Sequence, residues 1–340
     1  MANKETNKEK MWALLVYLSS GQTRKAQTSM TETYDDSFWD YVVEEAAKSG
    51  INTILFEVDN AVELGSHPEL AVEGAWSRRR MRKEIARCRE KGITLIPKFN
   101  FSTGHCYWLG EYRNKISTIE YYKLCNDIIK EIYELFDHPK YIHLGMDEED
   151  AHHVSYAPLA VYRQKELYWH DLRFLIDCVA DTGAKPWITS CPLFRNPEEF
   201  PKRIEPDEVI ISPWQYHGLY KEHYTRIDSR QEYIDYYAKP PYCNMNLTYV
   251  EDEPYQVLYM EQALPNMKKG YCYFPTVSVY NKHRYNALDT LRYYKENAPD
   301  EQMIGYLTAP WFLVKWENKD KFDESFRLLK EAREKYYGDK

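Results

Sequence analysis

The chain has 340 residues, 44% of them hydrophobic, and a formal net charge of −8, so it is long enough for one large α/β barrel of about 250 residues. The acidic balance argues against nucleic acid as a partner, because no basic stripe is available to neutralise phosphates. No apolar run approaches the roughly 18 residues of a membrane span, and seven scattered cysteines without a CxxC pair indicate neither a zinc ribbon nor a disulfide framework.

Segments typical of strands and of helices alternate along the chain. Eight apolar segments predict strands that start near Met11, Asn52, Thr94, Tyr141, Pro186, Glu208, Tyr271 and Met303. The patterns between and after them predict helices over Ser37–Ser49, Ser77–Lys91, Thr118–Phe136, Leu159–Thr182, Tyr255–Lys268, Leu288–Asn297 and Lys321–Tyr337. A capping box between Ser117 and Glu120 is expected to start the third helix.

Four of the joints between a helix and the next strand carry a glycine, namely Gly50, Gly92, Gly183 and Gly270. Glycine after the last helical turn adopts the left-handed conformation at little cost and turns the chain back. The repeated joint predicts a parallel, repetitively wound fold. With eight strand–helix units, the favoured fold class is α/β, a single (β/α)8 TIM barrel.

The barrel is expected over residues 11–340, with an irregular insertion around 216–254 that contains a strand-like Tyr242–Val250. Residues 1–10 are polar and are expected to form a disordered tail. They lack the apolar core of a signal peptide. We therefore expect a cytoplasmic protein, or a periplasmic or secreted one if a leader was removed before this numbering begins.

The stretch Tyr141–Asp150 begins as a short apolar strand and ends in four acids. In a (β/α)8 barrel the chemistry lies at the carboxyl ends of the strands, so Asp147 and Glu148 are expected at the mouth of the barrel. Paired carboxylates in differing environments are typical of the hydrolysis of glycosidic bonds. A solvated acidic loop explains a charge run as well, and we expect Glu149 and Asp150 to be loop or helix-start residues.

Polar and aromatic residues also gather after the other predicted strands. They are Glu57 and Asp59, then Asn100 and His105, then Trp187, Trp214, Tyr280 and Trp311. Rings with a polar tip suit surfaces that are half apolar and half wet, as sugar-binding clefts are. No glycine-rich phosphate loop is present. We therefore expect these residues to contact a carbohydrate substrate, and we predict neither a cofactor nor a metal.

Two motifs resemble a known family. His143-Leu144-Gly145-Met146-Asp147-Glu148 resembles the His-x-Gly-Gly-Asp-Glu signature of family 20 glycoside hydrolases, the β-N-acetylhexosaminidases. Upstream, the segment Pro97–His105 resembles that family's Pro-Glu-Ile-Asp-x-Pro-Gly-His, with one residue inserted. The resemblance implies a glycoside hydrolase that removes a terminal β-linked, N-acetylated hexosamine. The 2-acetamido oxygen of the substrate would itself attack the anomeric carbon.

The resemblance also implies roles for individual residues. Glu148 would protonate the leaving oxygen and later activate water, and Asp147 would hold the acetamido N–H. Adjacent strand residues point to opposite faces, so both acids can reach one sugar only if the strand breaks at Asp147. The supporting residues would be His105 and His143 beside the acids, and Trp187, Trp214 and Trp311 as walls of the pocket.

The chain departs from the family pattern at several positions. Met146 replaces a glycine, Asn100 replaces an aspartate, and Glu57 stands where the family usually has histidine. The first strand lacks the family's Asp-x-x-Arg, and Trp311 is not followed by the family's acid. The departures imply a divergent relative whose sugar can differ from that of the family.

Three other functions fit the same residues. An ordinary retaining glycosidase would use Glu57 or Asp59 as nucleophile, if its carboxyl group lies about 5–5.5 Å from that of the acid Glu148. A non-catalytic sugar-binding barrel is the second. The third and least favoured is a metal-dependent hydrolase or isomerase, whose candidate ligands are Asp147, Glu148, Asp150, His152 and His153.

Overall fold

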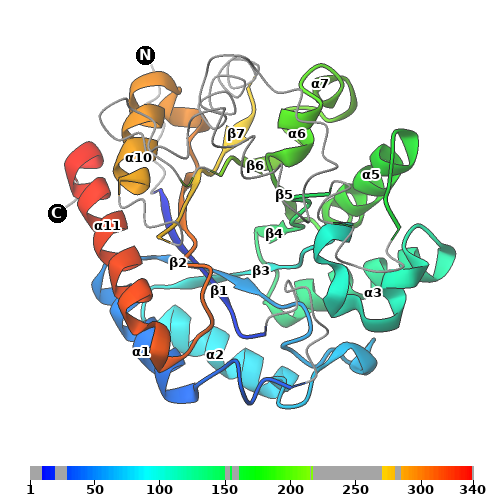
Figure 1. Cartoon of the computed structure of the whole chain (residues 1–340), viewed down its shortest axis with the longest axis horizontal. Coiled ribbons are helices and arrows are strands. Elements are labelled where there is room, and N and C mark those ends of the chain that lie inside the picture. Colours follow the sequence, from blue (N-terminus) through cyan, green and yellow to red (C-terminus); the bar gives the residue numbers. More distant parts are fainter. Residues whose placement is uncertain are drawn as a thin grey trace, which may run out of the picture.

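The computed structural model describes residues 10–19, 29–149, 154, 161–214, 216, 270–279 and 285–338. In these residues nine parallel strands form one curled sheet in the order β7-β6-β5-β4-β3-β2-β1-β9-β8, and helices surround it (Figure 1). The strands are β1 Met11–Tyr17, β2 Thr53–Glu57, β3 Thr94–Lys98, β4 Tyr141–His143, β5 Lys185–Thr189, β6 Ile210–Ser212, β7 Cys272–Tyr273, β8 Thr276–Val277 and β9 Gly305–Thr308.

The longer helices follow the strands in alternation, as the sequence predicts. They are α1 Asp36–Lys48, α2 Arg78–Glu90, α3 Ile119–Leu135, α5 Glu166–Ala180, α10 Asn286–Asn297 and α11 Lys319–Tyr337. Shorter helices that the sequence did not predict are α6 Cys191–Arg195 and α7 Phe200–Arg203, with 3-10 turns at Pro68–Leu70, Thr103–Lys115, Asp300–Gln302 and Trp316–Asn318. No helix in the described part of the chain has the length and apolar character needed to cross a bilayer.

The strands divide the core into two layers because successive side chains point to opposite faces of the sheet. In β1, Leu14 and Val16 pack with the helices, whereas Ala13 and Leu15 join an inner cluster. Leu55, Ile96, Ile210 and Leu307 belong to that inner cluster. The curled sheet therefore has a filled centre, and polar groups can gather only above it, where the strands end.

The predicted seventh strand is interrupted. Its first part, β7, pairs with β6, and its second part, β8, pairs with β9. Phe274 and Pro275 lie between the two parts. The Phe274 N–H still donates to the Ile211 carbonyl (2.9 Å), and the Leu307 N–H donates to the Pro275 carbonyl (2.9 Å). Eight predicted strands thus become nine, because proline cannot donate and the segment turns from one neighbour to the other.

The four glycine joints are confirmed. Gly50, Gly92, Gly183 and Gly270 have φ of 75°, 76°, 95° and 93°, in the left-handed region that favours glycine. The capping box is wrong in its residue. The N-cap of α3 is Thr118, whose Oγ1 accepts from the Tyr121 N–H, while the Ser117 hydroxyl donates to Asp171 Oδ2 at 2.6 Å.

The fourth predicted helix begins later than Leu159. Residues 161–164 are not helical, and α5 starts at Glu166 after Lys165, whose φ is 51°. The predicted helix Tyr255–Lys268, the strand-like Tyr242–Val250 and most of the insertion lie outside the described residues. So do residues 1–9 of the expected tail. Its last residue, Lys10, bonds through Nζ to the Met303 carbonyl at 2.9 Å.

Candidate active site

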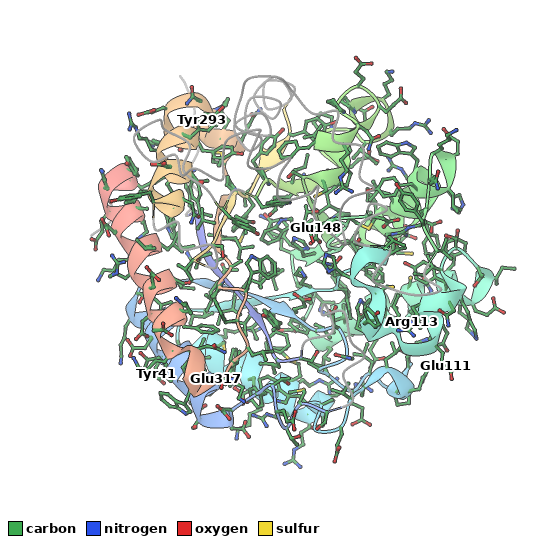
Figure 2. The ribbon with its side chains drawn as sticks, in the orientation of Figure 1. Tyr41, Glu111, Arg113, Glu148, Tyr293 and Glu317 are labelled. Carbon is green, nitrogen blue, oxygen red and sulfur yellow. The ribbon has the colours of Figure 1, made fainter. Side chains whose placement is uncertain are left out.

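A cavity of about 190 Å³ lies where the strands end. Its lining consists of Leu15, Lys98, His105, His143, Asp147, Glu148, Thr189, Ser212, Trp214, Tyr216, Thr276, Leu307 and Trp311. Figure 2 shows Glu148 near the middle of the view, within the ring of helices, and Tyr41 and Glu317 near the rim. The lining joins residues from seven strands and the segments after them, which explains how positions far apart in sequence meet.

The backbone after β4 leaves the extended conformation at once. Gly145, Met146 and Glu148 have positive φ values of 71°, 74° and 54°. A side chain at Gly145 would clash with the Asn100 amide and approach the Asn100 Cα to 2.8 Å, so only glycine fits there. The predicted break is therefore present, and it begins before Asp147. It lets two consecutive acids face the same cavity.

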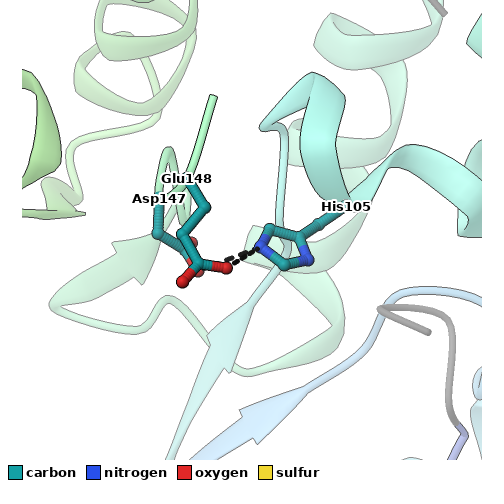
Figure 3. Close-up of side chains that lie close together, drawn as sticks. All are labelled: His105, Asp147 and Glu148. Carbon is teal, nitrogen blue, oxygen red and sulfur yellow. Dashed lines mark hydrogen bonds and ion pairs between the residues drawn. The ribbon is translucent and has the colours of Figure 1, made fainter. Parts of the chain in front are cut away.

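Asp147 and Glu148 converge on His105 (Figure 3). His105 Nε2 lies 3.2 Å from Glu148 Oε2 and 3.4 Å from Asp147 Oδ2. Asn100, predicted to contact substrate, does not line the cavity. Instead its Nδ2 donates to Asp147 Oδ1 at 2.9 Å, and its backbone N–H donates to Asp59 Oδ1. Asn100 therefore fixes one oxygen of Asp147 from behind.

The charges of this cluster stabilise one another. Burial alone would raise the pKa of Asp147, but His105, Lys98 and hydrogen bonds from Asn100 and the backbone hold it below its usual value. Burial also opposes a charge on His105, yet Asp147 and Glu148 raise the pKa of His105 to about 9. At neutral pH the cluster therefore holds an ionised Asp147 and an imidazolium at His105.

This arrangement predicts a pH dependence of stability. The pKa of His105 is raised by folding, so its contribution is complete below about pH 6.5 and is lost as pH rises through about 9. The shift corresponds to at most roughly 3 kcal/mol. Urea unfolding at pH 6 and pH 9.5 should show a larger loss of unfolding free energy in the wild type than in His105→Asn. Equal losses in the two proteins would contradict the ion-pair assignment.

His143 and Lys98 line the cavity deeper than the acids, on the strands themselves. The pKa of His143 is well below its usual value because of burial and nearby Lys98, and its Nδ1 accepts from the Gly145 N–H at 2.9 Å. Lys98 Nζ lies 2.7 Å from Glu57 Oε2, with both side chains almost fully buried. His143 is therefore neutral and helps to hold the backbone break in place.

Glu57 and Asp59 were predicted to contact substrate or to act as nucleophile, and neither lines the cavity. Glu57 is the counter-ion of Lys98. Burial, together with the charge of Glu57, raises the pKa of Asp59 well above its usual value. Glu57 is held in its ion pair and Asp59 is buried beside Asn100, so neither acid has access to a substrate in this cavity.

Three aromatic rings form one wall of the cavity. Trp214 and Tyr216 stack with ring centroids 5.3 Å apart, and Trp311 Nε1 donates to the Tyr216 hydroxyl at 3.0 Å. Trp187 does not take part, because it lies inside the sheet, fully buried, and donates from Nε1 to Ser212 Oγ at 2.7 Å. The prediction that Trp187 lines the pocket was wrong because this residue lies in the middle of β5 and points inward. Tyr280 lies outside the described residues.

Sequence reasoning missed several residues that the structure brings to the site. Lys98 and Ser212 end β3 and β6, so their position at the last residue of a strand was a usable signal. Glu149 was expected to be a loop or helix-start residue, and it does lie in a loop, where it is buried and bonds Arg163 through both oxygens, at 2.7 Å and 2.5 Å. No sequence signal pairs Glu149 with Arg163.

The cluster also has ligand types that a metal could use. Atoms of His105, Asp147 and Glu148 lie within 4.8 Å of one another. A metal-bound imidazole must be neutral at the ligating nitrogen, whereas the two carboxylates raise the pKa of His105 to about 9. A proton on His105 therefore competes with a metal at neutral pH. Asp150, His152 and His153 lie outside the described residues.

No protein-family model and no curated protein matches the sequence. Solved structures do match. The N-acetyl-β-hexosaminidase of Streptomyces plicatus, in complex with Thio-NAglucal, has a TM-score of 0.61 at 11% identity over 95% of this chain and 63% of its own. The family 20 β-N-acetylhexosaminidase of Streptomyces coelicolor has a TM-score of 0.59 at 13% identity, over 95% and 63%.

A third similar structure is the family 20 exo-β-N-acetylglucosaminidase of Vibrio harveyi in complex with N-acetylglucosamine. Its TM-score is 0.55 at 14% identity, over 97% of this chain and 58% of its own. The chain thus spans less than two thirds of the length of these proteins. In fold, the chain is similar to the family 20 β-N-acetylhexosaminidases, as the motif that ends in Asp147-Glu148 indicates.

Proposed function

We propose that the chain is a glycoside hydrolase that removes a terminal β-linked N-acetylhexosamine by substrate-assisted retaining catalysis. The observation that carries the proposal is the convergence of Asp147 and Glu148 on His105. Each carboxylate lies within 3.4 Å of His105 Nε2, in a small cavity with an aromatic wall. A cavity of this size suits one sugar unit, and the aromatic rings of its wall suit the apolar face of a pyranose.

The proposed reaction uses the two acids differently. In the first step the 2-acetamido carbonyl oxygen forms a bond to the anomeric carbon, the glycosidic bond breaks, and Glu148, in its protonated form, gives its proton to the leaving oxygen. Asp147, held ionised and oriented by Asn100, accepts a hydrogen bond from the acetamido N–H as positive charge develops. In the second step water attacks the anomeric carbon and gives a proton to Glu148, the bond to the acetamido oxygen breaks, and the sugar leaves with net retention.

Of the rival functions, an ordinary retaining glycosidase has less support from the geometry. An ordinary retaining enzyme needs a second carboxylate facing the sugar, but Glu57 is engaged by Lys98 and Asp59 lies behind the lining. Strained backbone at Met146 and Glu148, which costs about 1–3 kcal/mol per residue, occurs at active sites and ligand clamps alike, so the activity test below decides between an enzyme and a sugar-binding barrel. Strain of this kind is typical of functional sites.

We also propose that the sheet closes into a (β/α)8 barrel, with residues 272–277 as its seventh strand. The bridges from Trp214 to Thr276 and from Tyr273 to Met303 support closure. β7 pairs with β6 and β8 pairs with β9, so one short segment contacts both edges that closure must join. A closed barrel would place the acids over the sheet axis.

A panel of aryl β-glycosides tests the function. We expect hydrolysis of the N-acetylglucosaminide or N-acetylgalactosaminide and at least about 100-fold slower cleavage of the matching glucoside, which lacks the internal nucleophile. Activity should persist in a chelator. Equal cleavage of the glucoside would favour an ordinary nucleophile, loss with chelator and recovery with metal would favour a metal enzyme, and no cleavage would favour a binding barrel.

A further inference from the structure

A buried ion pair lies directly beside the acid loop. Arg163 Nε and Nη2 donate to the two carboxylate oxygens of Glu149 at 2.7 Å and 2.5 Å, and the two side chains are 0% and 2% exposed. The paired geometry is the bidentate fork that only arginine can make. Because both charges are out of water, loss of either partner would leave the other unpaired.

The same two side chains also bond the backbone that leads to His105. Arg163 Nη2 donates to the Phe101 carbonyl at 2.8 Å, and the Thr103 N–H donates to Glu149 Oε2 at 3.1 Å. Thr103 stands two residues before His105. The ion pair thus ties the segment after β3 to the segment after β4, which carry the histidine and the acids.

The pair is itself attached to the helices. Arg163 Nη1 lies 3.3 Å from Asp171 Oδ2 on α5. Asp171 also accepts from the Ser117 hydroxyl before α3 and from the Tyr122 hydroxyl on α3, each at 2.6 Å. Helices are more rigid than loops, so these bonds restrain the segments after β3 and β4 relative to α3 and α5.

The acid loop needs such support. Met146 and Glu148 hold positive φ values that non-glycine residues adopt only when their surroundings impose them. Arg163 Nη2 lies 4.0 Å from Met146 Sδ, and Arg163 binds Glu149 on the other side of the acids. We propose that Arg163 and Glu149 are positioning residues, a clamp that sets the distances between His105 and the acids Asp147 and Glu148.

The experiment compares two lysine substitutions in the full-length protein. Arg163→Lys keeps the charge and loses the fork. Arg173→Lys is the control for loss of a fork alone, because Arg173 makes a similar fork to Glu208 from α5, at 2.5 Å and 3.0 Å, in a half-buried position away from the cavity. The first readout is the NMR titration of the His105 imidazole, assigned with His105→Asn, and the second is kcat on the aryl N-acetylhexosaminide.

In Arg163→Lys the titration midpoint of His105 should move toward that of an ordinary histidine, because the imidazolium loses its close contact with the carboxylates. Lys98 repels the same imidazolium and stays in place in both variants. A misplacement of about 1 Å should lower kcat by up to about 100-fold with a smaller change in KM. Arg173→Lys should change neither value.

A purely structural role would lower the melting temperature without moving the His105 midpoint, and a folded Arg163→Lys with an unmoved midpoint overturns the proposal. If Arg163→Lys does not fold, Glu149→Gln decides by the same readout, since glutamine keeps an acceptor for the Thr103 N–H. The proposed clamp depends on the proposed function in one respect, namely that Asp147, Glu148 and His105 are catalytic. A wild type that cleaves nothing would refute that function, while the titration would still test the clamp.

Discussion

Replacing Glu148 by glutamine should lower kcat on an aryl β-N-acetylhexosaminide by about 100- to 10,000-fold, the usual contribution of a positioned general acid–base. Glutamine has nearly the same shape but no proton to give to the leaving oxygen. The loss should depend on the aglycone. A phenyl leaving group needs the proton, whereas a dinitrophenyl group departs as a stable anion, so the dinitrophenyl substrate should lose less in its first step.

Glu111→Gln is the matched control for that variant. Glu111 is an exposed acid that lies at the rim of the molecule (Figure 2), and its substitution should leave kcat unchanged. Both variants should melt within a few degrees of the wild type, because neither substitution creates a buried unpaired charge. If Glu148→Gln cleaves the phenyl substrate at the wild-type rate, Glu148 is not the acid and the proposed mechanism fails.

The parallel α/β fold could be predicted from sequence because its signals are local. Gly50, Gly92, Gly183 and Gly270 each mark a helix end followed by a strand, and each has the left-handed backbone that the pattern requires. Repetition of one local unit fixes the order of strands in a parallel sheet. Phe274-Pro275 shows the limit of such reasoning, since the change of partner from β6 to β9 depends on the curvature of the whole sheet.

The candidate site could be predicted only in part. Asp147, Glu148, His105, Trp214 and Trp311 line one cavity, as the rule about carboxyl ends of strands predicts. The rule failed for Trp187 because it lies two residues before the end of β5. Trp187 and Thr189 point to the same inner face, but two residues along a strand are about 7 Å of depth, which separates a core position from a pocket position.

Residues that act through other residues were the hardest to predict. Asn100 was expected to touch substrate, and the structure places it behind Asp147 as a hydrogen-bond donor. Glu149 was expected to be a loop or helix-start residue, and its burial against Arg163 was not predicted. A run of acids predicts water around each of them. In the structure the backbone leaves the extended conformation after His143, so the first two acids of the run face the cavity and the third faces the interior.

Asp147→Asn should be the second most damaging substitution, and its effect should be selective. The ionised carboxylate is fixed by Asn100 and favoured by His105 and Lys98. In the proposed reaction it stabilises the positive charge that spreads over the acetamido group in the transition state. Loss of one such preorganised interaction costs on the order of 100- to 1,000-fold in kcat. Cleavage of substrates without the acetamido group, already slow, should hardly change.

A thiazoline that mimics the bicyclic oxazolinium ion separates this role from a general loss of structure. If Asp147 acts on the acetamido group, the affinity of the thiazoline should fall in Asp147→Asn by about the same factor as kcat/KM, because both report binding of the charged intermediate. His105→Asn is the informative comparison, since it removes the partner of Asp147 without removing the carboxylate. It should weaken the thiazoline less. An Asp147→Asn protein that loses equal activity on acetamido and glucoside substrates, with unchanged thiazoline affinity, would show that Asp147 serves the fold of the loop rather than the substrate.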